Sequence, residues 1–244
     1  MRNNRKKVFI ACITAVFCLL LTAAIGRKIY QTNERNQKGI LLAFDDASTD
    51  SWEAAFDLFD EYHVKVTFFV STPEILDFFD KAIDRGHEIG FHTSLHTNLL
   101  DNPDLLYTEA IEPLEVFQEA GYHITSFAYP YGAYADWMNV ELLQYYDTLR
   151  GAYNYRGTYK ESLKKGFIES FSIDNLHFAS DEEFHAKIIE MLDGLCGCDD
   201  GTVVSVYSHA IDSGDWCISP ERLKILFEEA QKRNLKFYTF QDLQ

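Results

Sequence analysis

The stretch ILLAFDD, residues 40–46, decides the fold because it is a short apolar run that ends abruptly in two adjacent carboxylates. Further short apolar runs follow along the chain, and stretches of helical periodicity separate most of them. Regular alternation of strands and helices predicts a parallel sheet with helices packed outside it. With about seven or eight strands, we expect closure into an α/β barrel rather than an open sheet.

Eight strands and six helices are expected from this pattern. The predicted strands are Ile40–Phe44, Val66–Val70, Glu88–Phe91, Ser126–Ala128, Thr148–Ala152, Ile168–Ser172, Thr202–Tyr207 and Lys236–Tyr238. The predicted helices are Trp52–Tyr62, Pro73–Arg85, Pro103–Ala120, Asp136–Tyr146, Asp181–Leu195 and Pro220–Arg233. Two helices carry clear start signals, because Ser219 precedes a proline at the first helical position and Ser180 precedes three acidic residues.

The charge of the chain is unevenly distributed. Eight Lys and Arg residues against one Glu give residues 1–38 a net charge of +7, whereas 14 basic and 37 acidic residues give the remainder −23. A body this acidic is not expected to bind nucleic acid phosphates. Two interpretations of the acidity stay open, namely solubility alone and affinity for a neutral or cationic polymer such as a partly deacetylated amino sugar.

An uncharged apolar segment at residues 8–25, VFIACITAVFCLLLTAAI, follows the basic start and is long enough to cross most of a bilayer. The same pattern describes a secretory signal, with small residues at 22–24 available for cleavage. Residues 1–28 are therefore predicted to be a membrane anchor or a cleaved signal, residues 29–38 a linker and residues 39–244 one domain. Either alternative exports that domain, as expected for a protein of the bacterial cell envelope.

Three cysteines lie in the body of the chain, Cys196, Cys198 and Cys217, while Cys12 and Cys18 belong to the apolar segment. An odd number in the body gives no complete disulfide framework. The Cys196-Gly-Cys198 sequence lacks the spacing and the second pair that structural zinc sites use. One disulfide with Cys217 and three free thiols both stay open.

Two pairs of polar side chains follow the first and third predicted strands. Asp45 and Asp46 end the first, and the third leads into His92-Thr-Ser-Leu-His96. Either pair alone is more often a turn or a surface feature. The C-terminal ends of barrel strands meet at one mouth, however, and a helical turn would stack the two imidazoles on one face. Two imidazoles and one carboxylate with an open position for water make a catalytic zinc site.

Two other motifs also follow strands. His209 ends the seventh strand in Val206-Tyr-Ser-His209, and its expected position at the same mouth makes it a candidate acid. The turn Tyr129-Pro130-Tyr131-Gly132 follows the fourth strand and can aim a backbone N–H at a reacting oxygen.

Taken in order, AFDD at 43–46, HTSLH at 92–96, AYPYG at 128–132 and YSH at 207–209 resemble the motifs of the polysaccharide deacetylase family, also called the NodB-homology family. The resemblance spans most of the chain from Ile40 onward. It implies a distorted (β/α) barrel with about seven strands that removes acetyl groups from a polysaccharide. The arginine-free loop is closest in style to the branch that acts on poly-N-acetylglucosamine.

The resemblance also implies roles for five of these residues. Asp46, His92 and His96 would hold a divalent metal, with Zn²⁺ expected and Co²⁺, Ni²⁺ or Fe²⁺ as alternatives. Asp45 would be the catalytic base and His209 the catalytic acid.

A second set of residues is expected to contact the substrate. By the same resemblance, Tyr129, Pro130 and Tyr131 would line the sugar groove, and the backbone N–H of Tyr131 would help to hold the oxyanion. Trp137 and Trp216 could stack on sugar rings, with ordinary packing as the alternative.

Three departures from the family pattern concern residues near the expected base and acid. Ala47 stands where the family has a glycine after the Asp pair, and Ala128 stands where it has an arginine that helps to orient the base. The Asp-Trp motif that tunes the acid is not recognisable. Asp174 is the nearest candidate, with a helix cap or a turn as its alternative role.

These residues together predict a hydrolase that removes N-acetyl groups from poly-N-acetylglucosamine, a chitin-like oligomer or peptidoglycan and releases acetate. One alternative is an O-acetyl esterase on a xylan-like polysaccharide, since metal-activated water cleaves esters more easily than amides. Another is a sugar-binding remnant of the same fold without turnover. The expected partners are an N-acetylated polysaccharide and, through residues 1–28, the membrane, with no nucleic acid.

Overall fold

A computed structural model of the chain describes residues 37–152 and 166–243, and its main compact unit runs from Lys38 to Gln244. Eight parallel strands form its sheet in the order β10-β1-β2-β3-β4-β5-β6-β7, and β1 pairs with β7 as well. Their bounds are β1 (Gly39–Asp46), β2 (Thr67–Val70), β3 (Glu88–Phe91), β4 (Ser126–Ala128), β5 (Thr148–Ala152), β6 (Phe167–Ser172), β7 (Val203–Ser208) and β10 (Lys236–Tyr238).

The pairing of β1 with β7 closes strands β1 to β7 into a ring. One edge of β1 pairs with β7 over residues 39–44. The other edge is shared, because its first three residues pair with β10 and its last four pair with β2. This sharing distorts the ring, and the predicted distorted (β/α) barrel of about seven strands is confirmed. A short parallel pair, β8 (Ala210–Ile211) with β9 (Cys217–Ile218), was not predicted.

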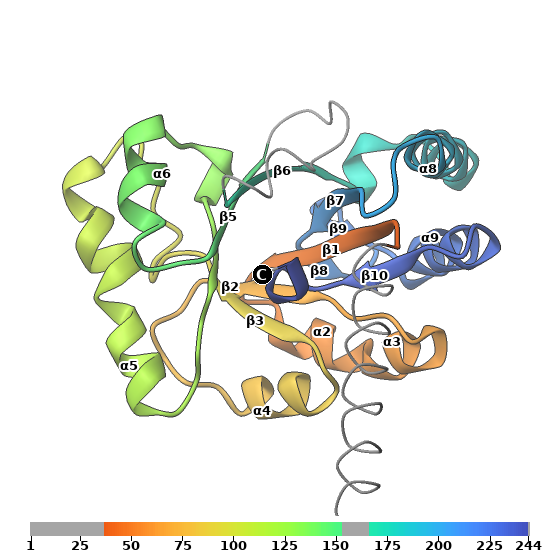
Figure 1. The fold of residues 1–244 in the computed structure, drawn as a ribbon. Helices are drawn as coiled ribbons and strands as arrows, with labels where there is room; N and C mark the ends of the chain where they lie inside the picture. The colour runs from red at the N-terminus through yellow and green to blue at the C-terminus, as the bar shows by residue number, and fades with distance from the viewer. Residues whose placement is uncertain (1–36, 153–165, 244) are drawn as a thin grey trace, which may run out of the picture. The chain divides into compact units, whose positions relative to one another are not determined.

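Helices lie outside the ring of strands (Figure 1). Serine side chains begin two of them as predicted, since Ser180 accepts the N–H of Glu183 and Ser219 accepts the N–H of Arg222. The helices are α2 (Thr49–Ala54), α3 (Phe56–Tyr62), α4 (Asp77–Asp84), α5 (Pro113–Glu119), α6 (Asp136–Leu142), α8 (Asp181–Cys196) and α9 (Pro220–Lys232). The shorter turns are η1 (Pro103–Leu105), η2 (Tyr107–Ile111), η3 (Pro130–Gly132), η4 (Asn175–His177) and η5 (Gln241–Leu243).

Four predicted helices were wrong in extent. The helix expected at 136–146 ends already at Leu142. The helix expected at 52–62 is two helices, because the N–H of Ala55 bonds back three residues to Trp52 and interrupts the α-helical ladder. The helix expected at 73–85 starts only at Asp77, since Leu76 is still extended with φ −106° and ψ 144°. The helix expected at 103–120 is three segments, and the π-helical η2 ends two residues before Pro113, which has no N–H to continue the ladder.

The N-terminal end of the barrel is closed by the C-terminal part of the chain. The Phe240 ring packs edge-on against Phe69 inside the barrel, with centroids 5.1 Å apart. The buried Glu88 carboxylate accepts hydrogen bonds from the hydroxyls of Thr67 and Ser126 at 2.8 and 2.5 Å and from the Gln241 N–H at 2.9 Å. In Figure 1 the C-terminal turn accordingly lies over the centre of the ring.

Two predictions about the N-terminal segment and the cysteines have different outcomes. Residues 1–28, predicted to be an anchor or a signal, lie outside the described residues, as do Cys12 and Cys18. Within 37–152 and 166–243, no helix combines the length and apolar character needed to cross a bilayer. Cys196, Cys198 and Cys217 are all free, so the disulfide alternative is wrong.

A buried imidazole sits in the aromatic core between β2 and α3. The His87 ring stacks on Phe56 at 5.5 Å and meets the edge of Phe68, and its Nδ1 accepts the N–H of Val66 at 3.2 Å. Burial lowers the pKa of His87 to about 4, with Asp60 opposing the shift and Arg85 and Lys65 adding to it. Protonation would also remove the acceptor that Val66 uses.

His87 is expected to make the fold acid-sensitive. Because its folded-state pKa is lowered, its stabilising effect is complete above its unfolded pKa of about 6.5 and is lost as pH falls toward 4, amounting to roughly 3 kcal/mol. Urea unfolding between pH 7 and pH 4 should therefore show a shallower loss of stability in His87→Gln, which keeps an acceptor but does not titrate. Parallel pH profiles for the two proteins would contradict this assignment.

Candidate metal and acid–base site

A cavity of about 420 Å³ opens where the C-terminal ends of the strands converge, a volume within the range of small-ligand sites. Eight of the ten predicted site residues line it: Asp45, Asp46, His92, His96, Tyr129, Tyr131, His209 and Trp216. Four further residues complete the lining: Gly132, Arg150, Ala152 and Tyr207. Pro130 is buried between two residues that line the cavity, and Trp137 lies half exposed on α6 without lining it.

Asp46, His92 and His96 form a cluster that could hold a metal ion, since one potential ligand atom of each lies within 4.8 Å of the others. The Oδ1 atom of Asp46 is 3.3 Å from Nε2 of His96 and 3.9 Å from Nε2 of His92. That oxygen is buried and has no hydrogen-bond partner among the described residues. A buried carboxylate oxygen without a donor is costly in a protein interior, and a cation between these three groups would satisfy it.

His92 is prepared as a neutral ligand. Its Nδ1 lies 2.8 Å from the carbonyl oxygen of Ala128, so Nδ1–H donates to that carbonyl and Nε2 keeps its lone pair on the cavity side. Burial lowers the pKa of His92 to about 3, and the nearby positive charge of Arg150 adds to the effect. The ring is therefore uncharged at neutral pH, as metal ligation requires.

Left-handed backbone, rather than the expected helical turn, brings the two imidazoles together. Residues 92–96 are irregular, and Thr93 and His96 have φ of 62° and 53°. The two histidine rings nevertheless lie 5.0 Å apart. Asp46 and Tyr131 also have positive φ, at 83° and 60°, so three residues that line the cavity, Asp46, His96 and Tyr131, have strained backbone.

Arg150 on β5 stands beside Asp45, where sequence motifs suggested no cation. Its Nη2 donates to Oδ2 of Asp45 at 2.6 Å, and both side chains are almost completely buried. The guanidinium also packs against the Tyr207 ring at 4.4 Å. Burial raises the pKa of Asp45 while the charge of Arg150 opposes that rise. Arg150 is the register partner of Ala128 on the neighbouring strand β4. It therefore brings a guanidinium to Asp45 although position 128 carries none.

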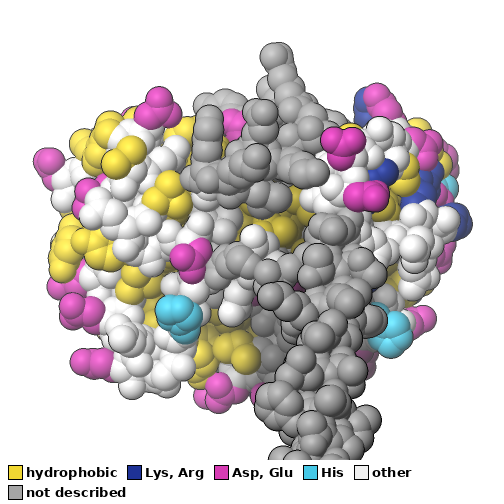
Figure 2. Space-filling model, viewed as in Figure 1, with side chains coloured by type: hydrophobic (Ala, Val, Ile, Leu, Met, Phe, Trp, Pro, Cys, Tyr) yellow, Lys and Arg dark blue, Asp and Glu magenta, His cyan; other side chains and the backbone are white. Residues whose placement is uncertain are grey.

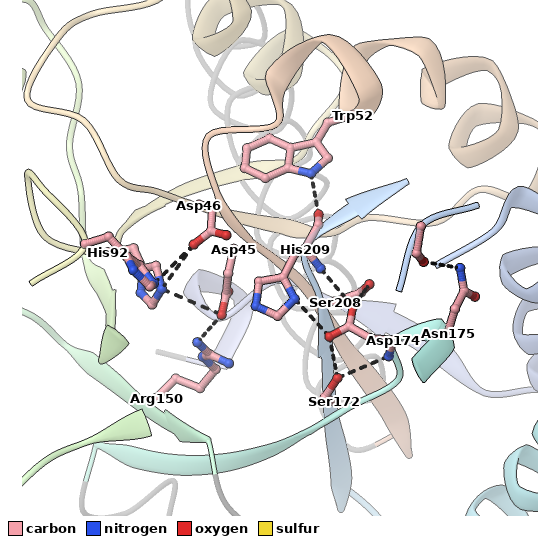
Figure 3. Close-up of polar contacts among 12 residues, drawn as sticks. Asp45, Asp46, Trp52, His92, Arg150, Ser172, Asp174, Asn175, Ser208 and His209 are labelled. Atoms are coloured by element: carbon pink, nitrogen blue, oxygen red, sulfur yellow. Dashed lines mark hydrogen bonds and ion pairs between the residues drawn. The ribbon is translucent and has the colours of Figure 1, made fainter. Parts of the chain in front are cut away.

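His209 is held by Asp174, which follows β6. Nδ1 of His209 lies 2.9 Å from Oδ2 of Asp174, so Nδ1–H donates and Nε2 is left for the cavity. The hydroxyls of Ser172 and Ser208 also donate to this carboxylate, at 2.6 and 2.5 Å. The indole N–H of Trp52 donates to the His209 carbonyl at 2.7 Å. Figure 3 shows Asp45 lying between the His92 and His209 rings.

The hydrogen-bonded pair of His209 and Asp174, the His209–Asp174 dyad, shifts the pKa of both residues. Burial lowers the pKa of His209, but the hydrogen bond to Asp174 and the charge of Asp45 outweigh burial, so the net pKa is raised. Burial acts to raise the pKa of Asp174, and its bonds to His209 and the two serines lower it overall. The ion pair is therefore favoured near neutral pH. Asp174 stands at the N-cap position of η4, the alternative role, but its carboxylate makes no capping hydrogen bond and instead bonds His209 and the two serines.

Trp216 is presented by a loop that Asn175 secures. The Asn175 amide donates to the carbonyls of Asp212 and Gly214 at 3.2 and 2.9 Å (Figure 3 labels Asn175). The Trp216 ring meets His209 edge-on at 5.7 Å while remaining 63% exposed. An exposed indole at the rim of the cavity can stack on an apolar sugar face.

Acidic side chains are scattered over the face of the molecule shown in Figure 2. The visible Lys and Arg side chains gather on the side where α8 and α9 lie. No continuous basic strip that could follow a phosphate backbone crosses the described part of this face.

Comparison with known sequences identifies one family. A sequence model of the polysaccharide deacetylase family matches residues 32–147. No curated protein sequence matches the chain.

Several solved structures share the fold. An acetyl xylan esterase of family 4 from Clostridium thermocellum, in complex with a cobalt ion, is 21% identical, covers 84% of this chain and 89% of its own, and has a TM-score of 0.59. The peptidoglycan deacetylase PdaC from Bacillus subtilis is 16% identical over 86% of this chain and 91% of its own, with a TM-score of 0.56. A mutant of the pseudoenzyme BA3943 with restored activity is 15% identical over 85% and 68%, with a TM-score of 0.60.

Asp174→Asn is expected to lower the pKa of His209. Burial lowers this pKa, and the hydrogen bond from His209 to the Asp174 carboxylate is the largest effect that raises it. An NMR titration of the His209 ring protons in metal-free protein would measure the change. Ser172→Ala is the matched control, since it removes a neighbouring bond but leaves the charge of Asp174 in place. Equal His209 pKa values in wild type and Asp174→Asn would contradict the dyad.

Proposed function

We propose that this chain, which belongs to the polysaccharide deacetylase family and is a hydrolase, removes N-acetyl groups from an amino-sugar polymer. Poly-N-acetylglucosamine, a chitin-like oligomer and peptidoglycan are the substrate classes that we propose. The observation that carries the proposal is the convergence of three units on one cavity: the Asp46–His92–His96 cluster, the Asp45–Arg150 pair and the His209–Asp174 dyad.

Asp46, His92 and His96 would hold the metal. A divalent metal bound there would polarise the acetyl carbonyl and lower the pKa of a bound water to about 7. The donor set of two imidazoles and a carboxylate with an open position suits Zn²⁺. Imidazole ligands also accommodate Co²⁺, Ni²⁺ and Fe²⁺, and the acetyl xylan esterase contains cobalt.

Asp45 would act as the base. Arg150 fixes one of its oxygens, whereas the other, Oδ1, is buried with no hydrogen-bond partner among the described residues. A fixed carboxylate with an unused oxygen at the cavity can accept the proton of the attacking water. Burial, which raises the pKa of Asp45, makes the protonated form less unfavourable once that proton has moved.

His209 would act as the acid. The nitrogen of an amide leaves as a strongly basic anion unless a proton reaches it as the bond breaks. Asp174 keeps His209 in the tautomer whose Nε2 is on the cavity side and favours its protonated form. Figure 3 shows His209 on the side of Asp45 away from His92, so the proposed acid lies across the base from this metal ligand.

Tyr131 and Trp216 would form the exposed sugar-binding walls, and Tyr129, which is fully buried with its hydroxyl on Asn139, would line the cavity behind them. The Tyr131 ring lies over His96 with centroids 4.6 Å apart, and Trp216 lies against His209, so exposed aromatic rings flank the polar groups. We propose that Tyr131 also supplies its backbone N–H to the oxyanion, with Pro130 setting the turn. Trp137 would contact sugar units beyond the cavity.

The domain would work outside the cytoplasm. The basic start and the apolar residues 8–25 support export, with the segment serving as an anchor or as a cleaved signal. A polymer of the bacterial cell envelope would be accessible to the domain in that location.

Measuring acetate release from N-acetylated and from O-acetylated polymers distinguishes an amidase from an esterase. The protein loaded with Zn²⁺ or Co²⁺ is expected to release acetate from N-acetylglucosamine oligomers or peptidoglycan. His209→Ala should lower the rate on these amides by about 10²–10⁴-fold. It should lower the rate on acetylated xylan less, because an alkoxide leaves with less assistance.

Equal losses on both substrates would remove His209 as the acid for an amide. Release from xylan alone would favour the O-acetyl esterase, a candidate supported by the likeness to the acetyl xylan esterase fold. No acetate from any substrate, with metal bound, would favour a sugar-binding protein.

Mutation of the proposed base and mutation of a proposed metal ligand are expected to have different effects on metal binding. Asp45→Asn should keep the metal and lose at least about 10²-fold in turnover, because the amide cannot accept the water's proton. His92→Ala should lose both metal and turnover. Metal content and acetate release measured on the same preparations check this, and an active Asp45→Asn protein would refute the role of Asp45.

A further inference from the structure

The loop that carries His96 adopts a conformation that its own sequence does not favour. Thr93 is β-branched and fully buried, yet its φ is 62°, and His96 has φ of 53°. Such residues cost about 1–3 kcal/mol each and persist only where the surroundings determine them. Something outside the loop must therefore hold the backbone between the two histidines.

Glu109 holds it through two successive amides. The N–H of Ser94 donates to the backbone carbonyl of Glu109 at 3.1 Å. The N–H of Leu95 donates to its side-chain Oε2 at 3.0 Å. Glu109 is only 7% exposed, whereas the Leu95 side chain is 76% exposed, so the link between them runs through the backbone of the loop.

The sequence around Glu109 explains why its carbonyl is free for this role. In an α-helix that carbonyl would accept the N–H four residues later, but residue 113 is a proline and has none. The chain forms the π-helical turn η2 (Tyr107–Ile111) at this point. Such turns are rare and occur frequently at functional sites.

Other contacts secure both ends of this link. The hydroxyl of Tyr146 donates to the Ala110 carbonyl and holds η2 from the far side. The Thr93 hydroxyl accepts the N–H of Thr97 at 3.0 Å, and the Ser71 hydroxyl donates to the His92 carbonyl at 2.9 Å. Glu109 is thus the part of this arrangement that reaches the loop midway between the two histidines.

We propose that Glu109 is a positioning residue of the metal site, which fixes the backbone between His92 and His96 so that both imidazoles meet Asp46. The inference rests on the proposed function only in taking this cluster as the metal site. Glu109 touches neither metal nor substrate and acts through the amides of Ser94 and Leu95. Loss of its carboxylate therefore lowers metal affinity and distorts ligand geometry, while the barrel core stays intact.

Metal affinity in the full-length protein tests this proposal. Glu109→Ala and Glu109→Asp, whose shorter side chain does not reach Leu95, should bind metal about 10–100-fold more weakly, as is typical for residues that orient metal ligands. Glu109→Gln keeps an acceptor oxygen and should stay within about threefold of wild type. Competition with a chelator gives the dissociation constants, and the visible absorption of Co²⁺-loaded protein reports ligand geometry.

Glu88→Gln is the matched control, because Glu88 is also a buried acid that accepts backbone and hydroxyl hydrogen bonds but lies at the opposite end of the barrel. It should lower the melting temperature of the metal-free protein and leave metal affinity unchanged. Unchanged affinity in Glu109→Asp, or equal losses in Glu109→Gln and Glu109→Ala, would overturn the proposal even if Glu109→Ala did not fold. A wild-type protein without metal affinity would instead refute the proposed metal site itself.

Discussion

Closure of the barrel between β1 and β7 is the constraint on which the rest of the structure depends. Their register places Phe44 opposite Ser208, so Asp45 near the end of β1 and His209 just after β7 emerge at the same mouth. In an open sheet these two strands would lie far apart, and the proposed base would have no acid within reach. The same closure buries the Arg150 and Asp45 side chains, and burial makes their hydrogen bond stronger than it would be in water.

Periodicity predicted the barrel well because each strand is a short apolar run, and those runs are what the ring of strands buries. It failed where a local event interrupts a helix. Neither the bond from Ala55 to Trp52 nor the extended Leu76 has a pattern in the sequence. Pro113 did offer a signal, since a proline inside a predicted helix marks a break, and the break it marks is the turn that presents Glu109.

The site residues that belong to short sequence motifs could be predicted. Those that reach the site from other elements, such as Arg150 on β5, could not. The five residues expected to act on metal and protons share one cavity, because motifs that end parallel strands meet at one mouth. Arg150 was missed, although a charged residue within the apolar strand β5 could have indicated a buried partner. The contact of Trp52 with the His209 carbonyl had no sequence signal, since it depends on how α2 packs.

The sealing of the barrel floor by β10, Phe240 and Gln241 determines when the domain can fold. Gly39–Leu41 pair with Lys236–Tyr238, so the first strand acquires one of its neighbours only after almost the whole domain has been synthesised. Contacts between such distant parts of a chain form slowly. We have proposed that this protein is exported. Because the pairing of β1 with β10 forms late, the chain would stay incompletely folded, and so able to pass through a translocation channel, until it reaches the far side of the membrane.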